Sequence, residues 1–147
     1  MGTDKFVASV VESLHGLRIA KHRVAVLVGP TCLSREDLVE KIAGATDATY
    51  LDTLQDIMRK IGHEALGAYG PIDFCGQLVR LSDDAGTTLC IDDVDPLLVT
   101  FGIERAEQFF ALASNAIPRY PVLLVSALGD LLARSGFDSH RIFTPAK

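Results

Sequence analysis

The stretch VAVLVGPTCLSRE, residues 24–36, decides the fold of this chain. Its first five residues are apolar and mostly β-branched, and the run ends abruptly at Gly29-Pro30. After a polar turn, apolar side chains recur at helical spacing. A short apolar run bounded by glycine and proline is typical of a buried strand. The stretch therefore predicts a strand at 24–28, a loop, and a helix at about 35–43.

The loop partly matches the phosphate-binding pattern G-x-x-x-x-G-K-[ST], in which backbone N–H groups surround the phosphates. Gly29 matches the first glycine, and residues 30–33 fill the four free positions. Ser34, Arg35 and Glu36 replace the second glycine, the lysine and the hydroxyl residue. The candidate cofactor-binding residues are those of this variant loop: Gly29, Pro30, Thr31, Cys32, Leu33, Ser34, Arg35 and Glu36.

The three replacements predict weak phosphate binding or none. Glycine allows positive φ and a close approach of the backbone to the phosphates, and Ser34 provides neither at low cost. Arg35 keeps the positive charge, but its planar guanidinium is not equivalent to a compact ammonium. Glu36 could ligate a metal, yet its negative charge stands where the phosphate chain should lie.

Strand patterns alternate with helical patterns along the rest of the chain. The predicted strands lie at 24–28, 48–51, 87–91, 122–125 and 141–143, and the predicted helices at about 4–19, 35–43, 53–61, 72–81, 103–117 and 128–133. Residues 62–71 are predicted as a loop and 82–86 as a turn. Strands that are apolar on both faces are typical of a parallel sheet covered by helices on both sides. We therefore predict a three-layer α/β fold with a five-stranded, mainly parallel sheet.

The length of 147 residues predicts a single domain, 1–147. Within it we expect an N-terminal amphipathic helix at 1–20 and an α/β core at 24–143.

Acidic and polar residues follow two further strands. Asp92 and Asp93 come directly after the apolar run LCI, and Ser126 follows the run VLLV. Because right-handed crossovers place the carboxyl ends of parallel strands at one edge, these residues should lie near Gly29. In P-loop NTPases, which this arrangement resembles, a carboxylate at this strand end holds the magnesium ion, so Asp92 is the candidate metal ligand. Few carboxylates suffice, because magnesium keeps several waters. Asp93 is the candidate for orienting an attacking water. The alternative is that both aspartates only end a strand, as turn residues often do.

This set of residues resembles the AAA+ family of P-loop ATPases over about residues 24–143. The resemblance implies ATP with magnesium as the cofactor, and it implies that Ser126 contacts the γ-phosphate or the attacking water. The segment LLARSGFDSHRIF is similar to the family segment LLRPGRFD, whose arginine acts on the nucleotide of a neighbouring subunit, and Arg134 matches that arginine best. The candidate catalytic residues are therefore Asp93, Ser126 and Arg134. The helical lid of the family is expected to be missing.

More narrowly, the chain resembles the small P-loop component, BrxF-type, of bacterial BREX phage-defence systems. The stretches that carry this likeness are TYLDTLQDI, LCIDDVDPLL and YPVLLVSALGDLL. The resemblance implies partners among the other proteins of a defence complex, and self-association. Because the loop is substituted, we expect ATP binding more than hydrolysis. Any hydrolysis should need Arg134 of a neighbouring copy, because the lid is expected to be missing.

Composition excludes several other classes. The net charge of −5 argues against unspecific nucleic-acid binding, and the sequence signals no DNA contact. Three cysteines without a C-x-x-C motif indicate neither a disulfide framework nor a zinc site, which favours a cytoplasmic location. No apolar run is long enough to span a membrane.

Two alternatives to a nucleotide-binding protein remain. The first is a pseudo-NTPase that serves as an interaction scaffold, which the substituted loop favours. The second is a flavodoxin-like or response-regulator-like domain. A phosphate-accepting aspartate would then be expected after the first strand, where Gly29 stands.

Overall fold

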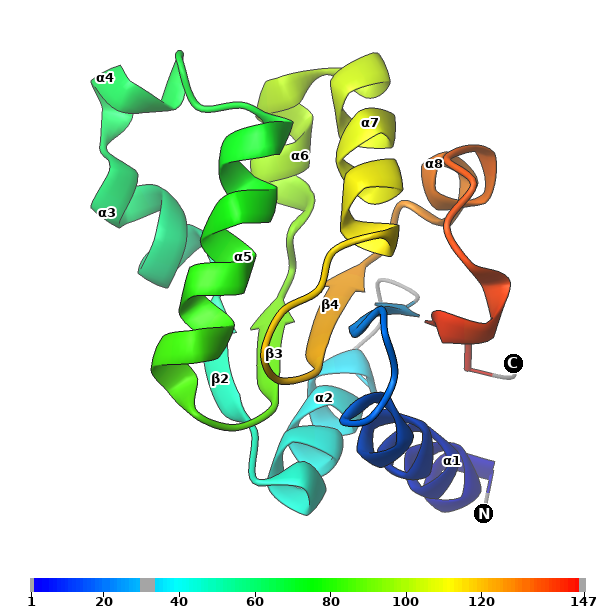
Figure 1. The fold of residues 1–147 in the computed structure, drawn as a ribbon. Helices are drawn as coiled ribbons and strands as arrows, with labels where there is room; N and C mark the ends of the chain where they lie inside the picture. Colours follow the sequence, from blue (N-terminus) through cyan, green and yellow to red (C-terminus); the bar gives the residue numbers. More distant parts are fainter. Residues whose placement is uncertain (1, 30–33, 146–147) are drawn as a thin grey trace.

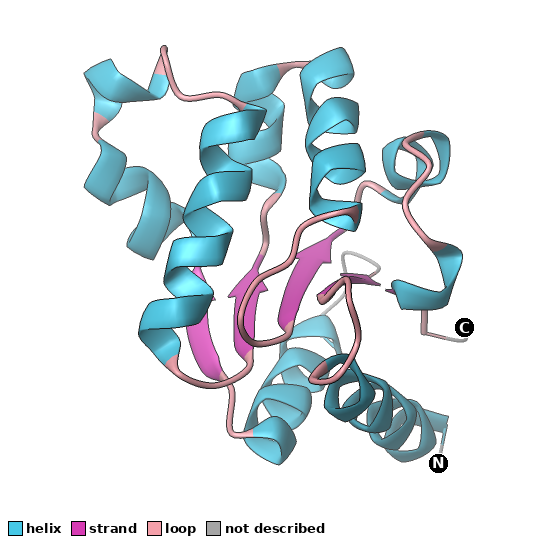
Figure 2. Cartoon of the chain, viewed as in Figure 1, coloured by secondary structure: helices cyan, strands magenta, loops and turns pink. Residues whose placement is uncertain are grey.

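A computed structural model describes residues 2–29 and 34–145 of the chain. Its centre is one parallel sheet of five strands in the order β2-β3-β4-β1-β5. The strands are β1 (Val24–Val28), β2 (Thr49–Asp52), β3 (Leu89–Asp92), β4 (Val122–Ser126) and β5 (Ile142–Phe143). Helices cover both faces of the sheet (Figures 1 and 2). The predicted three-layer α/β fold with a five-stranded parallel sheet is therefore confirmed.

The helices divide between the two faces of the sheet. On one face lie α1 (Gly2–Leu17) and α2 (Ser34–Thr46). On the other lie α5 (Pro71–Ala85), α6 (Asp95–Phe101), α7 (Ile103–Ser114) and α8 (Gly129–Arg134). The π-helix η1 (Thr53–Met58) follows β2 and leads into the short helices α3 (Arg59–Ile61) and α4 (His63–Leu66). A 3-10 turn, η2 (Ser139–Arg141), precedes β5.

Alternation along the strands explains why each face has its own core. In β1, Val24 and Val26 point into the core beneath α5, α6 and α7, whereas Ala25 and Leu27 point toward α1 and α2. Side chains of neighbouring strand residues point to opposite faces, so a run that is apolar throughout is buried on both. The larger core holds the stacked rings of Phe74 and Phe109, with centroids 4.7 Å apart.

The helical elements differ from the prediction in four places. The predicted turn at 82–86 is wrong up to residue 85, because α5 continues to Ala85 and ends at Gly86, which adopts a left-handed φ of 66°. The helix continues because Ser82 is buried and held in place by Tyr120. The Ser82 hydroxyl donates to the Tyr120 carbonyl at 3.0 Å and accepts from the Tyr120 N–H at 2.9 Å.

The predicted loop at 62–71 contains α4, and the helix predicted at 103–117 ends at Ser114. The helix α6 was not predicted at all.

In the part of the chain that the structure describes, no helix is long and apolar enough to cross a membrane.

Candidate functional site at the carboxyl edge of the sheet

A topological switch point, where a ligand-binding crevice is expected in an open parallel sheet, lies between the carboxyl ends of β1 and β4. The chain leaves β1 through α2 on one face and leaves β4 through α8 on the other. In an open parallel sheet, the place where neighbouring strands connect to opposite faces is where ligands bind. Val28 pairs with Ser126 in register, and the Gly29 N–H donates to the Ser126 carbonyl at 3.1 Å. Gly29 therefore begins its loop at this switch point.

The loop itself is only partly described. Pro30, Thr31, Cys32 and Leu33 lie outside the described residues, and so do the side chains of Ser34, Arg35 and Glu36. The helix that follows is described, and it begins at Ser34 and runs for 13 residues. It packs on the sheet through Leu38, Val39 and Ile42. The amino end of α2 therefore lies at the same edge as Gly29, where the helix dipole favours an anion.

The two aspartates lie at the same edge, one strand beyond β4. The register pairs Ile91 with Leu124, and Leu124 in turn pairs with Val26. Asp92 is thus separated from β1 by two strand spacings, roughly 10 Å. Asp93 adopts a left-handed φ of 51°, as does Asp47 at an ordinary helix end with a φ of 52°. Aspartate is among the residues that tolerate this region, so the backbone conformation alone does not mark Asp93 as functional.

Asp92 accepts hydrogen bonds from two residues of β2 and the start of η1. The Tyr50 hydroxyl donates to Asp92 Oδ2 at 2.5 Å, and the Thr53 hydroxyl donates to the Asp92 carbonyl at 3.0 Å. Burial, followed by the hydrogen bond with Asp92, raises the pKa of Tyr50, which therefore remains a donor at neutral pH. Sequence reasoning missed Tyr50, because its contact with Asp92 depends on the pairing of β2 with β3, which sets Tyr50 beside Cys90 and Asp52 beside Asp92.

Cys90 in β3 is a core residue. It is buried, and this burial, with a smaller effect of Asp92, raises the pKa of its thiol to about 12. The thiol therefore stays protonated at neutral pH and is a poor nucleophile.

Ser126 belongs to a closed hydrogen-bond network. Its hydroxyl donates to Asp95 Oδ1 at 2.6 Å and accepts from the Leu128 N–H at 3.0 Å. The second carboxylate oxygen of Asp95 accepts from the Ala127 N–H at 2.9 Å. The network joins the first turn of α6 to the connection between β4 and α8. Since Ser126 is 1% exposed, its hydroxyl is occupied within the chain.

Asp95 is a second residue of this edge that sequence reasoning missed. The signal was present, because Pro96 follows it and proline is common in the first turn of a helix. The apolar residues Leu97, Leu98 and Phe101 then follow at helical spacing, and all three are buried.

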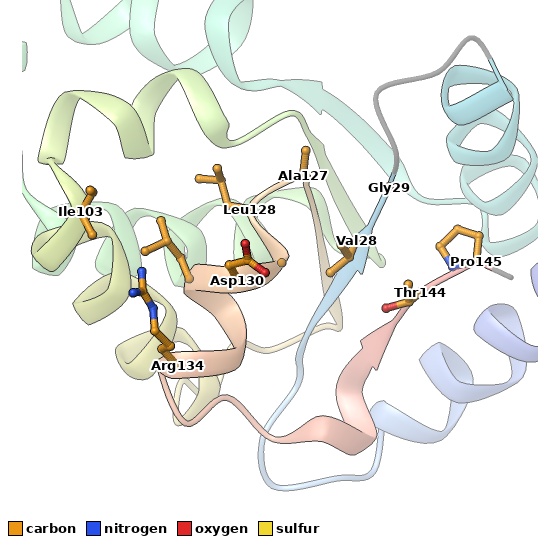
Figure 3. Close-up of a pocket in the computed structure, with 11 residues that line it drawn as sticks. Val28, Gly29, Ile103, Ala127, Leu128, Asp130, Arg134, Thr144 and Pro145 are labelled. Atoms are coloured by element: carbon orange, nitrogen blue, oxygen red, sulfur yellow. The ribbon is translucent and has the colours of Figure 1, made fainter. Parts of the chain in front are cut away.

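Arg134 and Gly29 line the same pocket. The pocket has a volume of about 620 Å³. Most of its wall is apolar and comes from Val28, Ile103, Ala127, Leu128, Leu131 and Pro145. Its ionisable side chains are Asp130 and Arg134, both exposed residues of α8. Figure 3 shows Arg134 and Ile103 on one side of the pocket, and Gly29, Thr144 and Pro145 on the other.

The structure thus brings the predicted site residues together only in part. Gly29 and Ser126 are neighbours across β1 and β4, and Asp92 and Asp93 lie on the same edge one strand further. Arg134 shares a pocket with Gly29, but Asp92, Asp93 and Ser126 do not line that pocket. Among the residues described, no group of three or more metal-binding side chains is placed to hold an ion. The roles assigned to these residues from the sequence stay predictions.

Comparison with known proteins supports the fold. No family model matches the sequence. No curated protein matches it either. The structure is similar to that of PCH-2 from C. elegans, with a TM-score of 0.54 and 12% sequence identity. The match covers 99% of this chain and 43% of the PCH-2 chain, so the chain spans less than half the length of that protein. The fold is AAA+-like, in agreement with the resemblance noted in the sequence.

Proposed function

We propose that this chain binds a nucleoside triphosphate in the crevice between the carboxyl ends of β1 and β4, with Asp92 as the residue that would hold its magnesium. The observation that carries the proposal is that the chain leaves β1 and β4 toward opposite faces of the sheet, because ligands bind at such a switch point. Gly29 begins its loop there, and the dipole at the amino end of α2 favours phosphate, although Glu36 adds a negative charge to the first turn of this helix.

Binding is favoured over turnover for two reasons. The variant loop replaces three of the residues that the phosphate-binding pattern requires. In addition, the Ser126 hydroxyl already donates to Asp95 and accepts from Leu128, so it would have to exchange a partner before it could contact a phosphate. Magnesium, when bound, would neutralise charge on the phosphates, and Asp92 is the side chain that fits it because a carboxylate is a preferred ligand of this ion.

Titration calorimetry tests the proposal. Wild-type protein should bind ATP with magnesium at micromolar to millimolar concentrations. Asp92→Asn should weaken that binding roughly tenfold, because it removes the charge but keeps an oxygen that can accept from Tyr50. With EDTA in place of magnesium, wild type and Asp92→Asn should bind ATP alike. Asp84→Asn, which changes an exposed aspartate in the last turn of α5, is the matched control. Absence of heat from the wild type at millimolar ATP would refute nucleotide binding.

We further propose that the chain is a component of a bacterial phage-defence assembly of the BREX type. The support is the sequence likeness of the stretches TYLDTLQDI, LCIDDVDPLL and YPVLLVSALGDLL. A second candidate function is that of a pseudo-NTPase scaffold within such an assembly. It is favoured by the internal hydrogen bonding of Ser126 together with the substituted loop.

Phage challenge of a host that carries the defence system separates the two functions. Deletion of the gene for this chain should abolish protection. If nucleotide binding is needed, Asp92→Asn should lose protection while the purified variant remains folded and Asp84→Asn protects normally. A scaffold predicts instead that Asp92→Asn protects as well as wild type. Full protection after deletion of the gene would contradict the defence role itself.

A further inference from the structure

The pocket beside Gly29 has the properties of a small-molecule site. Its volume of about 620 Å³ lies within the range of about 300–1,000 Å³ that is usual for ligand pockets. Such pockets combine mainly apolar walls with a few polar groups that fix the orientation of the ligand. Here six apolar side chains form most of the wall, and Asp130 and Arg134 are its ionisable groups.

The position of the pocket relates it to the proposed nucleotide site. Val28 and Gly29, at the end of β1, line the pocket and also border the crevice in which the phosphates are proposed to bind. A phosphate chain is poorly suited to apolar walls, because burial of charge without compensating partners is costly. A nucleobase has apolar faces and a polar edge, so it suits both the walls and the two ionisable side chains.

We propose that this pocket receives the nucleoside end of a nucleotide bound to the same chain, and that Arg134 contacts its base; the inference rests on the proposed nucleotide-binding function. Arg134 then acts within its own chain. The family resemblance instead assigns this arginine to the nucleotide of a neighbouring copy. The geometry favours contact within one chain, because Arg134 and Gly29 of the same chain line one pocket (Figure 3).

The chemistry of the two ionisable side chains fits the edge of a purine. Arginine offers only donors, and an ionised aspartate offers only acceptors. Purine edges present both kinds of group, and a guanidinium can also stack on a ring. Asp130 and Arg134 stand four residues apart on α8, and within the described residues no ion pair joins them.

The test compares ATP, GTP and magnesium tripolyphosphate by titration calorimetry on the full chain. Arg134→Ala should weaken ATP and GTP binding about tenfold, a loss of about 1.4 kcal/mol, and leave tripolyphosphate binding unchanged. Ile103→Ala should weaken only the two nucleotides, by a smaller factor, and should fold normally because Ile103 is 67% exposed. Arg18→Ala, which removes an exposed charge near the end of α1, should change nothing.

Other results would contradict the inference alone or the proposed function together with it. Wild-type protein that binds neither ATP nor tripolyphosphate refutes the proposed function and this inference with it. Nucleotide binding that Arg134→Ala leaves unchanged, or weakens equally for tripolyphosphate, overturns the inference alone. The same holds if tripolyphosphate binds wild type as tightly as ATP does. Finally, Arg134→Ala protein can be mixed with an excess of Asp92→Asn protein, in which Arg134 is intact. Recovery of nucleotide binding by the Arg134→Ala protein in this mixture would show that the arginine acts between copies.

Discussion

Replacing Arg141 by methionine is expected to lower the free energy of unfolding by about 3–5 kcal/mol. The guanidinium is buried and donates to the Val24 carbonyl at 2.7 Å, to the Ser114 carbonyl at 2.7 Å and to the Ser114 hydroxyl at 3.1 Å. It thereby joins η2 to β1 and to the end of α7. Methionine fills similar space but donates nothing, so two backbone carbonyls lose their donors in a buried site.

Denaturant unfolding monitored by circular dichroism measures this effect. His140→Ala is the control, because His140 is an exposed neighbour whose imidazole interacts with Asp138, and it should change stability by at most about 0.5 kcal/mol. Arg141→Lys should fall between wild type and Arg141→Met, since one ammonium lacks the geometry of the guanidinium fork. A loss below about 1 kcal/mol for Arg141→Met would show that these contacts contribute little.

Replacing Asp95 by alanine is expected to cost about 2–4 kcal/mol. Its carboxylate accepts from the Ser126 hydroxyl and from the Ala127 N–H, at 2.6 and 2.9 Å. Hydrogen bonds to a charged acceptor are stronger than those between neutral groups, and the variant leaves the buried Ser126 hydroxyl without this acceptor. The change also removes an acidic group from the first turn of α6.

Thermal unfolding tests the Asp95 prediction. For a domain of this size, each kcal/mol corresponds to roughly 2–4 °C in Tm. Asp95→Asn should lose less than Asp95→Ala, because an amide has one acceptor oxygen and can keep one of the two bonds. Asp130→Ala, an exposed aspartate on α8, should leave Tm nearly unchanged. Equal Tm values for Asp95→Ala and wild type would mean that the network does not stabilise this edge.

Much of the fold could be predicted because the strands carry strong local signals. The runs VAVLV and VLLV are apolar throughout, and each becomes a strand buried on both faces. The helix α5 was predicted too short, since the run Ser82-Asp83-Asp84 has the composition of a turn. Ser82 is nevertheless buried and bonded to Tyr120, a residue 38 positions away. Tertiary contact thus overrode local propensity there.

The candidate site was predictable as a set of strand ends but not as a set of contacts. Because all five strands are parallel, Gly29, Asp92 and Ser126 share one edge, as expected from the crossover rule. The hydrogen bonds from Ser126 to Asp95 and from Tyr50 to Asp92 were not predicted. A hydroxyl or a carboxylate has several partners of suitable chemistry in the sequence, and only strand pairing selects among them.

The sequence by itself determined the local elements of this protein: which residues form the strands, which faces those strands bury, and which polar residues follow them. These properties depend on periodicity and on glycine and proline signals, which act over a few residues. The tertiary structure alone decided the strand order, the partners of Arg141 and Asp95, and the common pocket of Arg134 and Gly29. Those contacts join residues as far as 117 positions apart, so they form only when the sheet has assembled and its helices have packed.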